Sequence, residues 1–127
     1  MSGGAPEIRC EYCQMPQKCD LLPFHLDHVI ARQHGGSDAA NNLAWACLAC
    51  NNHKGPNIAG LDYETGQIMR LYHPRNDLCS EHFAWRGSEL VRLTAIGRVT
   101  VYVLAIDLRY RREVRESLIL EGEFPPP

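Results

Sequence analysis

Two Cys-x-x-Cys pairs bracket a polar segment in the first half of the chain: Cys10 with Cys13, and Cys47 with Cys50. Four thiolates at this spacing are the usual ligand set of a structural zinc site, which is tetrahedral and closed. Such a site leaves no coordination position for a substrate, so it holds structure and not chemistry. The pairs therefore predict a small fold stapled by Zn²⁺, with the reactive groups lying between them.

Disulfides are the alternative, since six cysteines could form three bonds in a small secreted protein. The paired spacing favours zinc, and the N-terminal residues lack the layout of a signal peptide. No apolar run approaches the roughly 20 residues that a membrane span needs. We therefore expect a cytoplasmic protein with structural zinc and no membrane partner. Cys19 and Cys79 have no neighbour at ligand spacing and are assigned no role.

The chain of 127 residues has the length of one ordinary domain, so we expect residues 1–127 to form a single unit. Residues 1–60 would be its zinc-bound core, and residues 61–127 an extension packed on that core. The formal net charge of −2 argues against a protein that coats nucleic acid by charge alone. A group of arginines near the C-terminus is interspersed with acids, which favours a solvated helix face over a DNA-binding stripe. The group is Arg109, Arg111, Arg112 and Arg115.

A short strand is predicted over residues 24–31, which alternate in polarity and contain β-branched residues. Successive side chains of a strand point to opposite faces. His25 and Asp27 should therefore share one face, and His28 should point from the other.

A loop is predicted over residues 33–42, where two adjacent glycines, Gly35 and Gly36, permit positive φ. Residues 43–46 predict a second strand. Residues 48–55 predict a helix that is stopped at Gly55 and the proline after it. The first half thus reads as two strands and a helix.

The second half has the pattern of two hairpins and two helices, with turns at residues 64–66 and 86–88. Thr94 predicts an N-cap for a helix over residues 95–106. The inward stripe of that helix would be Ile96, Val99, Val103 and Ile106. A last helix is predicted over residues 110–120. Its apolar side would be Tyr110, Val114 and Leu118. The fold class is therefore α+β.

The segment between the cysteine pairs carries groups suited to phosphodiester hydrolysis, which needs a base for water and a Lewis acid for the phosphate. Asp27 and Asn51 offer a carboxylate and an amide oxygen, which are hard ligands suited to Mg²⁺ or Mn²⁺. His28 is largely neutral near pH 7 and is available as a base.

These residues resemble the HNH nucleases of the ββα-metal type. The resemblance covers about residues 10–55 through the pattern C-x-x-C, DH, HGG, NL and C-x-x-C-N-x-x-K-G, in that order. It implies that His28 is the general base, that Asp27 and Asn51 hold the catalytic metal, and that the four cysteines hold zinc. It also implies that Asn42 braces the loop and orients the base. The remaining residues resemble the C-terminal part of small stand-alone bacterial members.

Two positions depart from the pattern of many members of this family. Many have His where this chain has Asn51, and a His ligand would tolerate softer metals. Many close relatives have Glu where this chain has Asp27, whose shorter side chain should keep the oxygen-ligand role. The preferred metal is therefore left open between Mg²⁺ and Mn²⁺.

Further residues near the motif are weighed one by one. His25 offers a third metal ligand, a hydrogen-bond partner of a metal ligand or a phosphate contact, and the alternative is an exposed strand histidine. His34, Lys54 and, more weakly, Arg32 could contact the DNA backbone. His53 is turned about 200° from Asn51 on a helix and is interpreted as a surface residue.

The function predicted from the sequence is a metal-dependent endonuclease that hydrolyses DNA phosphodiester bonds. The expected partner is double-stranded or branched DNA, because the cysteine, Asp-His and Cys-Asn spacing is also similar to that of phage nucleases that resolve DNA junctions. The alternative is a non-catalytic zinc module that binds nucleic acid or a protein. The sequence leaves cleavage of RNA and the oligomeric state open.

Overall fold

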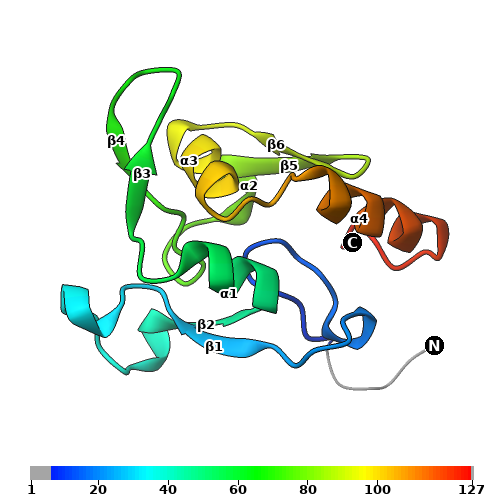
Figure 1. The fold of residues 1–127 in the computed structure, drawn as a ribbon, viewed down its shortest axis with the longest axis horizontal. Helices are drawn as coiled ribbons and strands as arrows, with labels where there is room; N and C mark the ends of the chain where they lie inside the picture. The colour runs from blue at the N-terminus through cyan, green and yellow to red at the C-terminus, as the bar shows by residue number, and fades with distance from the viewer. Residues whose placement is uncertain (1–6, 127) are drawn as a thin grey trace.

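The computed structural model describes residues 7–126 and has the predicted α+β class (Figure 1). Its described part contains three two-stranded antiparallel sheets and four α-helices, together with short 3₁₀ turns. The strands are β1 His25–His28, β2 Leu43–Ala46, β3 Ala59–Leu61, β4 Ile68–Arg70, β5 Phe83–Arg86 and β6 Glu89–Arg92. The α-helices are α1 Leu48–Lys54, α2 Cys79–His82, α3 Ala95–Val103 and α4 Arg109–Leu120. The 3₁₀ turns are Gln17–Cys19, Arg32–His34 and Ala40–Asn42.

The first half is a hairpin covered by a helix, with α1 packed on the β1–β2 pair (Figure 1). Asp27 pairs with Ala44 across the hairpin. Strand β2 and helix α1 lie where the sequence predicted them, and α1 ends before Gly55, whose φ is +51°. Strand β1 is shorter than predicted, because the chain turns after His28 to bond the loop that leads into β2.

The loop of the first cysteine pair is bonded to strand β2 through Glu11. The Glu11 backbone N–H donates to the Trp45 carbonyl at 2.8 Å, and the Glu11 carboxylate accepts from the Trp45 N–H at 2.7 Å. The loop that holds Cys10 and Cys13 therefore lies beside β2, from which the second pair follows directly.

The two later hairpins have the predicted turns, and both contain a glycine with positive φ. Gly66 has φ +74° between β3 and β4, and Gly87 has φ +60° between β5 and β6. Helix α3 packs against β3, β4 and β6. At Gly60 a side chain would clash with the methyl groups of Val99 and Val103, because a Cβ there would lie within 3 Å of both.

Helix α3 begins as predicted but ends earlier. Thr94 caps it, because its side-chain oxygen accepts a hydrogen bond from the Gly97 N–H at 3.1 Å. The helix stops at Val103 because Ala105 adopts a left-handed conformation with φ +52°. The Ile106 N–H then donates back to the Val101 carbonyl at 3.0 Å, which closes a Schellman motif. Ile106 is buried as predicted, but it lies beyond the helix.

The predicted inner side of the last helix is right at Leu118, which is buried, and wrong at Tyr110 and Val114. Tyr110 and Val114 are 54% and 42% exposed, whereas Arg111 and Arg115 are only 7% and 2% exposed, beside the buried Leu118. These two arginines are not part of a solvated face, although Arg109 on the same helix is exposed. Their guanidinium groups are buried because carbonyl and acidic oxygens surround them.

A search of the described residues for a membrane-crossing helix finds no candidate with the required length and apolarity.

Candidate functional site

The four paired cysteines form one buried cluster. Their sulfur atoms all lie within 4.8 Å of one another, and the Sγ atoms of Cys13 and Cys47 are 3.6 Å apart. A tetrahedral zinc site with bonds of about 2.3 Å has sulfur atoms about 3.8 Å apart. The N–H groups of Cys13 and Cys50 point at the sulfur atoms of Cys10 and Cys47, at 3.5 and 3.4 Å. The cluster is positioned to form a closed four-thiolate metal site.

The thiols of this cluster do not ionise alike. Burial raises the pKa of Cys10 and Cys50 well above the usual value. Hydrogen bonds from Cys10 and the other thiols lower the pKa of Cys13. A divalent ion that binds all four as thiolates must displace protons from the thiols that burial keeps neutral. Metal affinity should therefore fall as the pH falls.

Three residues that the sequence singled out meet at a second, separate place. Asp27 and His28 from β1 and Asn51 from α1 line one open cavity of about 350 Å³. Arg32 and Gly55 are also on its wall. Asn51 reaches the cavity because it directly follows a cluster cysteine on a helix that packs over β1.

Asp27 is held on two sides and is only 6% exposed. The Tyr12 hydroxyl donates to its Oδ2 at 2.8 Å. The Lys54 ammonium lies 3.2 Å from Oδ2 and 3.4 Å from Oδ1, and it also donates to the His28 carbonyl at 3.1 Å. Tyr12 lies between the two cysteines of the first pair, so the cluster and the cavity are directly connected.

The expectation that Lys54 contacts the DNA backbone is wrong in this fold, because its side chain is buried and bonded within the protein. A lysine at the end of a surface helix ordinarily reaches solvent. Here its ammonium is drawn inward by the buried carboxylate of Asp27, which needs a partner of opposite charge.

His28 is fixed by a residue that sequence reasoning missed. Its Nε2 lies 2.8 Å from Oδ1 of Asp38, which also accepts from the Arg32 Nε at 2.8 Å. Hydrogen bonds from Arg32 and then His28 lower the pKa of Asp38, so its carboxylate is charged. A carboxylate accepts hydrogen bonds, so Nε2 carries the proton and Nδ1 of a neutral His28 keeps its lone pair.

Asn42 braces the loop between β1 and β2. Its side-chain oxygen accepts from the Ile30 N–H at 2.9 Å, and its amide donates to the carbonyls of Ile30 and Ser37 at 3.0 and 2.7 Å. Of the two loop glycines, Gly35 has positive φ, whereas Gly36 is needed for close approach: a Cβ there would lie 1.7 Å from the Ile30 oxygen.

The other predicted site residues do not line the cavity, apart from Arg32. His25 is exposed on β1 opposite Ala46, and His34 is exposed in a 3₁₀ turn. His53 is exposed on α1, as predicted. Apart from the four cysteines, residues 7–126 contain no group of three or more His, Cys, Asp and Glu side chains placed to share an ion.

Comparison with known proteins finds a match for the segment that contains both the cysteine cluster and the cavity. Residues 10–57 match the family model described as HNH endonuclease. Neither a curated protein nor a solved structure matches the chain. The matched segment begins at the first cluster cysteine and ends just beyond α1, so it includes the cysteines, the β1–β2 hairpin and the helix. Over residues 10–57, the chain is therefore similar to the HNH endonuclease family.

Proposed function

We propose that this protein is a metal-dependent endonuclease that hydrolyses DNA phosphodiester bonds. The observation that supports it most is the shared cavity of Asp27, His28 and Asn51, inside a segment that matches a nuclease family. A carboxylate, an imidazole and an amide oxygen in one open cavity are the groups that metal-assisted hydrolysis requires.

Two different metals would occupy the four-cysteine cluster and the cavity of Asp27 and Asn51. Zn²⁺ suits the four buried thiolates and would hold structure there. Mg²⁺ or Mn²⁺ suits the oxygen atoms of Asp27 and Asn51, and so few protein ligands leave room for water and phosphate. When bound, that second ion would act as a Lewis acid toward the phosphate.

In the proposed reaction His28 takes a proton from the attacking water at Nδ1, while its Nε2–H remains bonded to Asp38. Lys54 and Tyr12 hold the Asp27 carboxylate in position. Asn42 supports this arrangement by fixing the loop that carries Asp38. As the water oxygen bonds to phosphorus, the P–O3′ bond would break and the leaving 3′ oxygen would take a proton from solvent. The products would be a 5′-phosphate and a 3′-hydroxyl.

The substrate in this proposal is double-stranded or branched DNA. Arg32 lies on the cavity wall, and His34 is exposed on the same turn, so both can contact backbone phosphates. Four reduced thiols also favour a reducing compartment such as the cytoplasm.

We further propose that residues 1–127 work as one domain. Arg75, which follows the second hairpin, donates to the Leu43 carbonyl at 2.7 Å and pairs with Glu11 at 3.1 Å. The segment after the matched region thus contacts both β2 and the first cysteine loop.

The experiment is cleavage of supercoiled plasmid by zinc-loaded protein, with Mg²⁺, Mn²⁺ or no added divalent ion. We expect nicking only with the added ion. Asn51→Ala should raise the Mn²⁺ concentration for half-maximal cleavage by at least about 10-fold, as loss of a metal-supporting group usually does. Asn52→Ala is the matched control, because Asn52 is exposed on the same helix and does not line the cavity.

Parallel reactions with single-stranded DNA, four-way junctions and RNA would identify the preferred substrate. If zinc-loaded protein cuts none of them at any Mg²⁺ or Mn²⁺ concentration, the alternative of a non-catalytic zinc module is favoured over the nuclease.

A further inference from the structure

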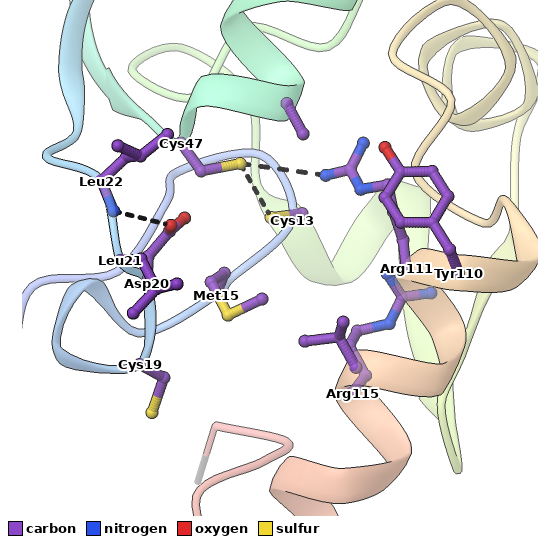
Figure 2. Close-up of a pocket in the computed structure, with 12 residues that line it drawn as sticks. Cys13, Met15, Cys19, Asp20, Leu21, Leu22, Cys47, Tyr110, Arg111 and Arg115 are labelled. Carbon is purple, nitrogen blue, oxygen red and sulfur yellow. Dashed lines mark hydrogen bonds between the residues drawn. The ribbon is translucent and has the colours of Figure 1, made fainter.

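Arg111, in the first turn of α4, touches the cysteine cluster from the opposite end of the sequence. Its Nη2 lies 3.1 Å from the Cys50 sulfur and 3.9 Å from the Cys47 sulfur. Figure 2 shows the guanidinium directed at Cys47, with Arg115 one turn further along the helix. Within residues 7–126, Arg111 is the only cationic side chain that donates a hydrogen bond to a cysteine sulfur.

The position of this guanidinium is fixed by the end of α3. Its other terminal nitrogen, Nη1, donates to the Leu104 carbonyl at 2.8 Å and to the Ala105 carbonyl at 3.2 Å. Both carbonyls belong to the Schellman end of α3, where the partial charge of a helix is negative. One nitrogen is therefore anchored on protein oxygen while the other faces sulfur.

The charges of the two groups are complementary. Four thiolates around Zn²⁺ carry a net charge of −2, and the four cysteines are at most 3% exposed. Arg111 is 7% exposed, so its positive charge also lacks the stabilisation of water. Each buried charge lowers the cost of burying the other, and the sulfur contact brings them together.

We propose that Arg111 is a positioning residue of the zinc centre, where it neutralises part of the thiolate charge and couples the docking of α4 to metal binding. This inference rests on the proposed zinc at the four cysteines and is independent of the proposed nuclease reaction. It assigns the C-terminal helix a role in metal retention.

Arg115 provides a matched control on the same helix. It is also buried, and it donates to the carbonyls of Ser88 and Ile106 at 2.9 and 2.8 Å and pairs with Asp107. None of its hydrogen bonds reaches a sulfur atom. Its loss should weaken the fold without a matching loss of zinc.

The test is competition for zinc between the full chain and a chromophoric chelator. Arg111→Gln should bind zinc about 10- to 100-fold more weakly than the wild type, the usual loss for a group that supports metal ligands. Arg115→Gln should stay close to the wild type, and Arg111→Lys should lie between, because it keeps the charge but loses the two-sided contact. Equal zinc affinity of Arg111→Gln and the wild type would overturn the proposal. A wild-type protein that binds no zinc would also overturn the proposal.

Hydrogen exchange of the wild type keeps the proposal testable if Arg111→Gln does not fold. Amides of α4 should exchange faster after the zinc is removed by chelation, while amides of α3 change less. Equal protection of α4 with and without zinc would show that the helix does not depend on the metal centre.

Discussion

Replacing His28 with alanine should reduce DNA cleavage by about 10²- to 10⁴-fold, the usual contribution of a general base. The residue lines the cavity shared with Asp27 and Asn51, and its Nε2 contact with Asp38 leaves Nδ1 free to accept a proton. The variant should retain its zinc, since the side-chain hydrogen bond of His28 goes to Asp38 and not to the cysteine cluster. Initial rates of plasmid nicking at saturating Mn²⁺, together with zinc content, measure both effects.

His53→Ala is the matched control for this prediction, because His53 is exposed on α1 and lies outside the cavity. It should cut at the wild-type rate. Comparable rates for His28→Ala and the wild type would show that another group accepts the proton, and the proposed role of His28 would then be abandoned.

Replacing Cys47 with serine should unfold the N-terminal half of the chain. Structural zinc contributes about 10–16 kcal/mol in zinc-finger peptides, which is comparable to the whole stability of an ordinary domain. Cys47 is 3% exposed and contacts Cys13, so a serine there would remove one of four ligands from the buried cluster. Thermal unfolding followed by circular dichroism, with zinc content measured on the same samples, tests the prediction.

Cys19→Ser makes the same chemical change at a half-buried cysteine outside the cluster and should have little effect. Loss of the cluster should also abolish cleavage, because Tyr12 connects the first cysteine pair to Asp27, and Asn51 follows the second pair. An unchanged melting temperature for Cys47→Ser would mean that the cluster does not hold the fold.

The parts of the fold that were predictable from the sequence are those with local signals. The helix that begins after Cys47 is predictable because Gly55 and the proline after it stop it, and the structure gives nearly the same bounds. The hairpin turns were placed by Gly66 and Gly87, both of which have positive φ. The end of α3 was missed because Ala105 adopts that conformation without being a glycine.

Periodicity predicted the buried Leu118 of α4 but not the rest of its inner side, because the other two buried positions are arginines. Arg111 is buried only where the carbonyls at the end of α3 and the sulfur of Cys50 receive its hydrogen bonds. Those partners are distant in sequence, so a local pattern of apolar residues pointed to Tyr110 and Val114 instead. On this helix, tertiary contacts decide which side chains are buried more than the hydropathy of the residues does.

The same limit applies at the candidate site. The sequence identified Asp27, His28 and Asn51 because they belong to a motif. Tyr12 and Asp38 were missed, since only the folded hairpin brings the first cysteine loop to Asp27 and the loop after β1 to His28.

In the proposed enzyme, a four-cysteine frame holds Asp27 and Asn51 over a second, oxygen-bound ion. The most direct measurement is an anomalous difference map from crystals of the zinc-loaded protein soaked in Mn²⁺. The proposal predicts zinc among the four cysteine sulfurs and a separate manganese ion bound by the side-chain oxygens of Asp27 and Asn51. Zinc at the cysteines with no manganese at those two residues, at a concentration that saturates cleavage, would contradict it.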